Sequence, residues 1–188
     1  MSQSVTNEAA NESLETGSDI ANRIDNIVAS IAREFKSIPS DEFFRSPANA
    51  WSPALNLKHL NKAALPLSLG LALPKVSFLP MGKSDKQRSY KEVRDLYLEI
   101  IKKGAGAGVF TPLRTGEDGS EEKKLDLIKK FEKTHSTLTD RIRAWEEADL
   151  LRYRMPHPIL GMLSVREMLF FATYHLGHHA GKVLKRRA

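Results

Sequence analysis

Apolar residues recur at helical spacing in four long segments of this sequence, and no other feature constrains the fold as strongly. In the first segment they fall three or four positions apart, with charged residues between them, at Ile20, Ile24, Ile27, Val28, Ile31, Ala32 and Phe35. This spacing places an apolar stripe on one face of a helix. No run alternates convincingly at the period of two expected of a half-buried strand. The chain is therefore predicted to be all-α.

Capping residues indicate where two of these helices begin. Ser52 can cap free amides and Pro53 fits the first helical position, so the second helix is expected to start at about residue 53. Pro66 lies inside this segment and should kink or end the helix. Ser164 and Glu167 can form the reciprocal capping box in "SVRE" that starts a fourth helix, predicted to run to about residue 185.

Two further helices lie between these, separated by long connections. Residues 121–147 regain the helical pattern and are predicted to form the third long helix, and residues 90–103 an additional short one. Residues 74–88 and the glycine-rich run from residue 104 to 120 are predicted loops. Four long helices with long loops between the second and third fit a four-helix bundle better than any fold that contains a sheet.

Length and composition favour a single domain without thiol chemistry of its own. Residues 1–16 are rich in Ser, Asn, Glu and Thr and are predicted to be a disordered polar tail, which leaves residues 17–188 as one domain. The chain contains no cysteine, so a metal would need His, Asp or Glu ligands. Any reacting thiol would have to come from another molecule.

The charge pattern and the apolar runs bear on possible partners. The formal net charge of +6 can attract nucleic acid, but its spread along the chain favours solvated helix faces, so we do not expect a nucleic-acid partner. The most apolar run, residues 63–73, is short and is broken by Pro66 and Gly70. With no signal-like opening segment, this predicts a cytoplasmic protein that does not bind a membrane.

The segment "YHLGHHAGK" carries the clearest chemical signal. At about 100° per residue, His175 and His179 share the apolar face of the fourth helix, whereas His178 falls on the flank beside Phe171. Two histidines four residues apart on one face can bind the same ion. His59 is the natural third ligand, because it lies on an apolar face of the second helix about two turns from its capped start.

A structural interpretation competes with this hypothesis. A lone inward histidine is more often a hydrogen-bonded core residue than a ligand, so His59 alone would be weak evidence. The pair on the fourth helix is stronger, because two adjacent buried imidazoles without partners are costly. His135 could be a core residue or lie beside the ligands, His157 is expected in an extended loop before Pro158, and His178 at the rim of the site.

Three short motifs resemble known functional motifs but lack a residue or a structural context that those motifs require. "GKS" at residues 82–84 lacks the glycine that a phosphate loop needs five positions before Gly82, where Ser77 stands. "HLGHH" has the histidine spacing of a zinc protease helix, but Leu176 replaces the glutamate that acts as its base. "GAGAG" neither follows a strand nor leads directly into a helix, so it does not indicate a dinucleotide site.

The paired segments "WSPALNLKHL" and "HPILGMLSVREMLFFATYHLGHHAGKV" resemble the DinB-like superfamily, which includes YfiT-like proteins and bacillithiol and mycothiol S-transferases. The resemblance covers roughly residues 20–185. It implies a four-helix bundle with a divalent ion, often zinc or nickel, held by histidines that correspond to His59, His175 and His179. The region 74–120 departs from the shortest members and could form part of a lid or a substrate wall.

This resemblance implies a metal-dependent enzyme, a thiol S-transferase or a hydrolase, in which the metal activates a low-molecular-weight thiol or water for a small-molecule substrate. Zinc or nickel is the expected ion, although imidazole also suits manganese and iron. Glu167 and His178 are candidate proton-handling groups, and the protein is expected to be a monomer or a homodimer. The alternative is a non-catalytic stress-response or nucleic-acid-associated bundle, with a structural or empty histidine site.

Overall fold

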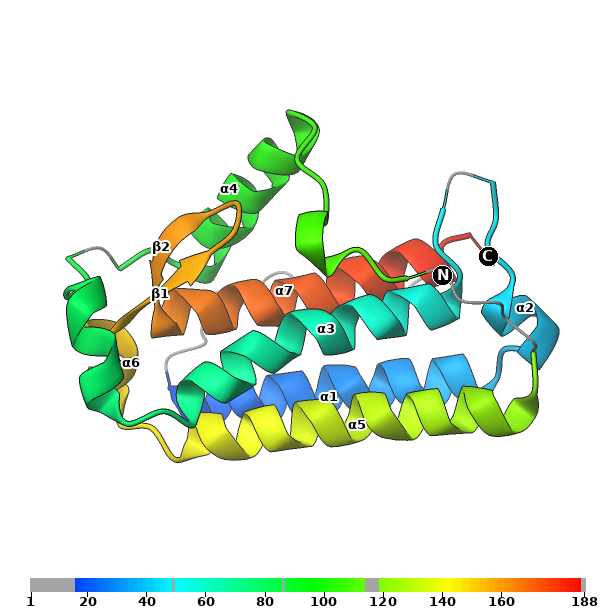
Figure 1. The fold of residues 1–188 in the computed structure, drawn as a ribbon, viewed down its shortest axis with the longest axis horizontal. Coiled ribbons are helices and arrows are strands. Elements are labelled where there is room, and N and C mark those ends of the chain that lie inside the picture. Colours follow the sequence, from blue (N-terminus) through cyan, green and yellow to red (C-terminus); the bar gives the residue numbers. More distant parts are fainter. Residues whose placement is uncertain (1–15, 49, 86, 114–118, 187–188) are drawn as a thin grey trace, which may run out of the picture.

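The computed structural model describes residues 16–48, 50–85, 87–113 and 119–186. Its body is a bundle of four long helices that run alongside one another: α1 (Gly17–Lys36), α3 (Pro53–Leu71), α5 (Glu121–Arg143) and α7 (Val165–Leu184) (Figure 1). Both α1 and α3 pack against α5 and against α7. The predicted all-α four-helix bundle is confirmed. The predicted disordered tail lies outside the described residues except for Thr16, which caps α1.

Shorter elements connect the long helices. They are α2 (Ser40–Phe44), the 3-10 helix η2 (Lys75–Met81), α4 (Tyr90–Lys102), the 3-10 helix η3 (Gly108–Phe110), α6 (Glu147–Arg152), and the antiparallel strands β1 (Arg154–His157) and β2 (Gly161–Ser164). The additional short helix predicted between the second and third long helices is α4. Together, α4 and η3 lie over the face formed by α3 and α7 (Figure 1).

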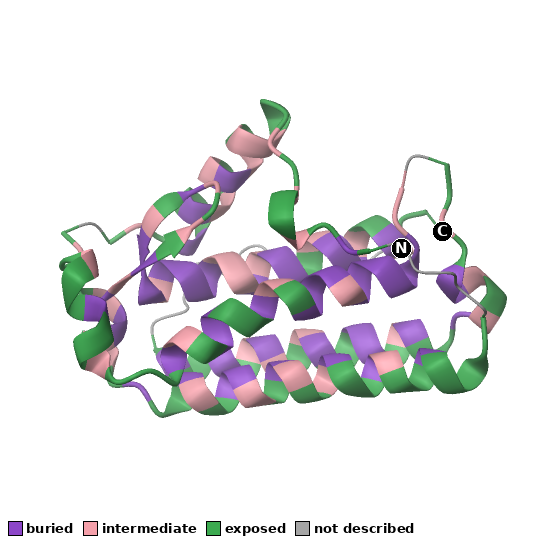
Figure 2. Ribbon diagram, viewed as in Figure 1, coloured by how far each residue is buried: buried purple, intermediate pink, exposed green. Residues whose placement is uncertain are grey.

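The core lies between the long helices, where their apolar stripes face inward (Figure 2). The largest fully buried side chains are Phe35, Phe43, Phe78, Phe131, Ile20, Ile24, Ile38, Leu55, Leu57, Ile128, Leu138 and Ile142. Burying each such side chain contributes about 1.5–3 kcal/mol before the entropy of ordering is subtracted. The apolar residues that recur at helical spacing in the sequence therefore lie on the helix faces that point into the core.

The second long helix continues through Pro66 instead of ending there, and it runs to Leu71. A proline removes the helical partner of the carbonyl four residues earlier, here that of Lys62. Both Lys62 and Pro66 are exposed, so water can bond this carbonyl. Leu67 and Leu71 are buried on the far side of the proline, and their packing favours continuation of the helix.

The prediction for the third long helix was wrong at its C-terminal end. Helix α5 ends at Arg143, and a separate short helix, α6, starts at Glu147. Trp145 lies in the break, where its Nε1 donates a hydrogen bond of 2.9 Å to the carbonyl of Leu71. The indole is buried by this turn of the chain, so a tertiary contact ends the helix although the local pattern continues.

Two other loop predictions also need correction. Residues 74–88 contain η2 and an isolated bridge between Lys83 and Tyr153. The segment before α7 forms the β1–β2 hairpin, with His157 as the last residue of β1 and paired with Gly161. Each strand has only four residues and β1 contains a proline, so too little alternation exists for the hairpin to be recognised from the sequence.

Among the described helices, none is by itself both long and apolar enough to cross a membrane, and only α3 and η2 reach that level as a pair, which is bent by 105°.

Candidate metal centre

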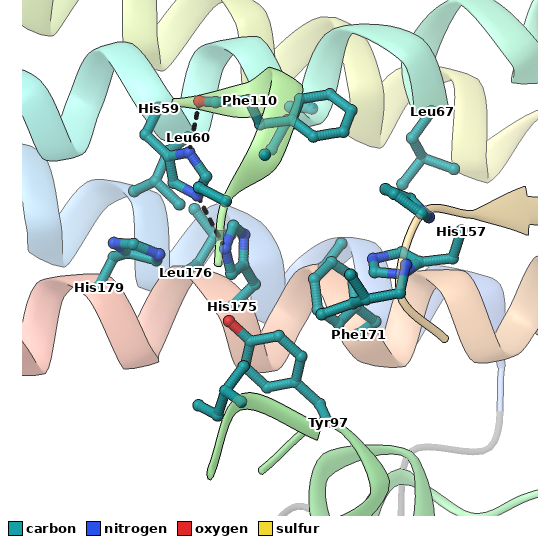
Figure 3. Close-up of a pocket in the computed structure, with 18 of the residues that line it drawn as sticks. His59, Leu60, Leu67, Tyr97, Phe110, His157, Phe171, His175, Leu176 and His179 are labelled. Atoms are coloured by element: carbon teal, nitrogen blue, oxygen red, sulfur yellow. Dashed lines mark hydrogen bonds between the residues drawn. The ribbon is translucent and has the colours of Figure 1, made fainter. Parts of the chain in front are cut away.

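Three buried imidazoles from two helices meet between α3 and α7 (Figure 3). His59 comes from α3, and His175 and His179 from α7, and their side chains are only 4%, 7% and 7% exposed. The Nε2 atoms of His59 and His175 lie 3.1 Å apart. One ligand atom from each of the three residues lies within 4.8 Å of the others. The structure thus brings together the three histidines singled out in the sequence.

The local helix starts explain why these side chains meet. The side chain of Ser52 accepts a hydrogen bond from the amide of Leu55, which fixes the first turn of α3 and places His59 about two turns further on. The capping box of Ser164 and Glu167 fixes the first turn of α7 in the same way. His175 and His179 follow on one face of that helix, a single turn apart.

The ring orientation of His59 is set by the 3-10 helix η3. The Nδ1 atom of His59 lies 2.9 Å from the carbonyl oxygen of Phe110. A carbonyl can only accept a hydrogen bond, so Nδ1 must carry the proton and donate it. In the neutral ring this leaves a lone pair on Nε2, the nitrogen that faces His175.

Asn56 sets the ring of His179 by the same logic. The Nδ2 group of Asn56 donates hydrogen bonds to the carbonyls of Trp51 and Ser52, at 3.3 and 2.9 Å. This fixes the amide orientation and turns Oδ1 towards Nδ1 of His179, 2.8 Å away. Nδ1 is therefore the protonated nitrogen, and the lone pair of His179 also lies on Nε2. Such outer partners are characteristic of metal-binding histidines.

The short contact between His59 and His175 has a chemical consequence. Because His59 Nε2 has no proton, two lone pairs would face each other at 3.1 Å unless Nε2 of His175 is protonated or a cation lies between the rings. One proton can serve only one pair of nitrogens, whereas a divalent cation can accept lone pairs from all three residues. The donor set therefore fits a divalent ion.

Burial keeps these imidazoles neutral. Burial is the main cause of the lowered pKa of all three histidines. The pKa of His59 falls below its ordinary value, that of His175 falls well below it, and that of His179 falls to about 2. Neighbouring histidines lower the pKa of His175 and His179 further, and the charge of Lys182 acts in the same direction on His59 and His179. A metal binds neutral imidazole, so protons compete weakly for the site near neutral pH.

The three histidines open into a large pocket of about 1120 Å³. Its walls come from α3, α4, η3, α5, the hairpin and α7, and they are mainly apolar, with Leu60, Leu67, Ile101, Phe171 and Leu176 among the lining residues. The region 74–120 contributes Tyr97, Ile101, Lys102 and residues 105–110 to these walls. Among the described residues that line the pocket, none is Asp or Glu, whereas Lys102, Lys182 and Arg186 are basic.

Glu167 lies apart from the three histidines. It is 2% exposed and closes the capping box with Ser164, and it accepts hydrogen bonds from the backbone and side chain of Arg88, with Nε at 2.7 Å. Burial alone would raise its pKa, but the bonds from Arg88 and the Ser164 amide lower it. Glu167 precedes His175 by about 12 Å along α7, and it does not line the pocket.

His178 stays on the flank of α7, as the helical angles predict. Its Nδ1 lies 3.2 Å from the hydroxyl of Tyr174, and its ring contacts those of Tyr97 and His179. Burial lowers its pKa to about 4. It is not one of the pocket-lining residues, in contrast to His135 and His157.

Several residues of the site carry no strong sequence signal. Asn56 precedes His59 by three positions on the same helix, so a search for polar residues on that buried face could have found it. The Phe110 carbonyl belongs to the backbone of a glycine-rich segment, and no residue type marks it. Tyr97 and Phe171 contact the ring of His175, at centroid distances of 6.2 and 5.0 Å, from two different helices.

This fold and site define a class: a four-helix bundle with a buried cluster of three histidines, one from α3 and two from α7, beneath a large apolar pocket. A sequence model of the DinB superfamily matches residues 28–183. The chain belongs to the DinB superfamily. Comparison with curated proteins and with solved structures gives no match.

Proposed function

We propose that this protein is a metal-dependent enzyme in which His59, His175 and His179 hold one divalent ion. One observation carries the proposal: the three ligand nitrogens converge within 4.8 Å, and Phe110 and Asn56 leave two of them with lone pairs directed at the cluster. Three imidazoles suit zinc or nickel, and also manganese or iron. When bound, such an ion would supply Lewis-acid activation of a thiol or of water.

Within this class, the pocket favours thiol transfer over hydrolysis. Hydrolysis commonly uses a carboxylate or another base to move protons from water. No Asp or Glu is found among the described residues of the pocket, and burial lowers the pKa of His135 and His157 to about 4, so both are weak bases. A thiol loses its proton more easily than water does and needs less help from the protein. Because the chain has no cysteine, the thiol would be a second substrate.

The charge of the site supports an anionic sulfur. Lys182 follows His179 by three residues on α7 and lines the pocket, and its charge lowers the pKa of both His59 and His179. A positive charge at this place favours a thiolate over a thiol. The mainly apolar walls offer few hydrogen-bonding partners to water beside the thiolate and its electrophile, which disfavours competing hydrolysis.

The test is a paired activity assay on the zinc- or nickel-loaded protein. We expect it to consume a small thiol, such as glutathione or free cysteine, in the presence of an aryl halide. We expect this to exceed its hydrolysis of an activated ester. Chelation of the metal and the substitution His179→Ala should both reduce thiol consumption by about a hundredfold or more, because both remove the ion.

Two outcomes would contradict the proposal. If the metal-loaded protein hydrolyses the ester but consumes no thiol, the centre is hydrolytic. If it holds the ion firmly and performs neither reaction across a panel of thiols and electrophiles, the histidine site has a structural role in a non-catalytic bundle.

A further inference from the structure

Two further histidines line the same pocket outside the cluster of three. His157 lies at the end of β1 and His135 in the middle of α5, and both line the same pocket. Figure 3 shows His157 and His179 on opposite sides of His175. The ring of Phe171 separates His157 from His175, with centroid distances of 4.3 Å to His157 and 5.0 Å to His175.

The hairpin turn fixes the tautomer of His157. The backbone amides of Ile159 and Leu160 donate hydrogen bonds to its Nδ1, at 3.3 and 3.1 Å. A nitrogen that accepts hydrogen bonds carries no proton, so the proton of the neutral ring lies on Nε2. Nδ1 faces its own hairpin turn and His157 lines the pocket, so we place Nε2–H on the pocket side of the ring.

His135 has the opposite tautomer. Its Nδ1 lies 2.9 Å from the carbonyl oxygen of Phe131, one turn earlier on α5, so it must carry the proton and donate a hydrogen bond to that oxygen. Nε2 therefore carries a lone pair and points away from its own helix. One wall of the pocket thus presents a hydrogen-bond donor and the other an acceptor.

Helix register places His135 on the His157 side of the metal centre. Arg141 contacts Ser68 and Trp145 contacts Leu71, so α5 and α3 run in the same direction along this face. His135 precedes Arg141 by six residues and is therefore level with about residue 62 of α3, roughly one turn beyond His59. Leu67 of α3 and Leu138 of α5 line the pocket beyond this level.

We propose that His157 and His135 form a subsite for a neutral hydrogen-bonding group of the ligand, an alcohol or an amide, with His157 as the donor and His135 as the acceptor. Such groups can donate and accept at the same time, as these two tautomers require. The assignment of this ligand to the substrate rests on the proposed function, but binding to the subsite does not.

A charged group fits this subsite poorly. The surrounding walls are apolar and hold no carboxylate among the described lining residues, so an ion would lose its hydration without a counter-charge. Burial lowers the pKa of both His135 and His157 to about 4, so neither imidazole becomes a counter-ion near neutral pH. Of the pocket's three basic side chains, Lys182 and Arg186 follow His179 on the chain, away from His157, and Lys102 is the last residue of α4.

The test measures binding of two probes of equal chain length, hexanamide and hexylammonium, to the full metal-free chain by NMR titration. We expect hexanamide to bind about tenfold more tightly or better, and to shift the ring signals of His157 and His135. His157→Asn should weaken hexanamide binding by about tenfold, the value of one hydrogen bond. An asparagine can still accept the turn amides, so the hairpin keeps its cap.

His135→Leu is the second variant and should weaken hexanamide binding by a similar factor through loss of the acceptor. Neither substitution should change zinc affinity or helical circular dichroism. Hexylammonium binding as tight as that of hexanamide would overturn the subsite, as would unchanged hexanamide affinity in both variants. Failure of zinc binding with the expected hexanamide result would refute the proposed function and leave the subsite standing.

Discussion

The candidate metal centre depends on residues that hold the imidazoles as much as on the imidazoles themselves. The side-chain oxygen of Asn56 and the Phe110 carbonyl each accept a hydrogen bond from an Nδ1–H group and so direct an Nε2 lone pair into the cluster. Helical spacing and capping identified His59, His175 and His179 from the sequence, because an inward position on a helix follows from its period. The tautomers could not be predicted, because they depend on contacts between distant segments.

Substitution of Asn56 tests this role. We expect Asn56→Leu to lower the affinity for zinc by about 10–100-fold, because His179 loses the acceptor that fixes its ring and its proton. Competition with a zinc-binding dye measures the change. Asn61→Leu is the matched control, since Asn61 is another buried asparagine of α3 and does not line the pocket. Equal zinc affinity in the two variants would show that Asn56 has no part in the centre.

The buried imidazole of His135 should make stability depend on pH. Burial lowers the pKa of His135 from 6.5 to about 4. Between these two pH values His135 is mostly protonated in the unfolded chain and mostly neutral in the folded chain. The free energy of unfolding then falls as the pH falls, by about 2 kcal/mol between about pH 7 and pH 5 for this group.

Urea titrations with a chelator present measure this pH dependence. His135→Leu should lose less stability than the wild type over the same interval, by about 2 kcal/mol, because it has no group to protonate there. The same loss in both proteins would mean that His135 is protonated in the folded state as easily as in the unfolded one.

At the scale of helices and strands, the sequence predicts where an element begins or ends when residues within or next to that element determine it. The starts of α3 and α7 follow from Ser52 and from the Ser164–Glu167 box. The end of α5 could not be predicted, because the fold of Trp145 onto Leu71 decides it. The hairpin could not be predicted, because strands of four residues show almost no alternation of apolar and polar residues.

The C-terminal end of α1 offers a direct test of whether a contact from another helix stabilises a helix end. The Nζ of Lys124 on α5 donates hydrogen bonds to the carbonyls of Lys36 and Ile38 at the end of α1, at 3.1 and 2.9 Å, and the residue is only 3% exposed. Lys124→Met keeps the chain length but leaves both carbonyls without this donor. We expect the free energy of unfolding to fall by about 2 kcal/mol.

Denaturant unfolding measures this change, with Lys129→Met as the matched control on an exposed position of the same helix. The control should stay within about 0.5 kcal/mol of the wild type. Similar effects of the two substitutions would show that the end of α1 does not depend on Lys124.

At the scale of the whole molecule, the bundle brings together residues that are far apart in the sequence. His59 and His175 come from helices more than a hundred positions apart, and α4 and η3 cover the face on which they meet (Figure 1). An ion bound to all three histidines would tie α3 to α7 and would stabilise the folded chain by mass action. The region 74–120 then supplies a wall of the pocket.

The central claim is that His59, His175 and His179 hold one divalent ion, and elemental analysis of the metal-equilibrated, desalted protein tests it most directly. We expect one zinc or nickel ion per chain in the wild type and in His178→Ala, the adjacent histidine that lies outside the pocket. His59→Ala, His175→Ala and His179→Ala should each lose the ion while keeping their helical content. A wild type that retains no ion, or ligand variants that retain as much as His178→Ala, would contradict the account.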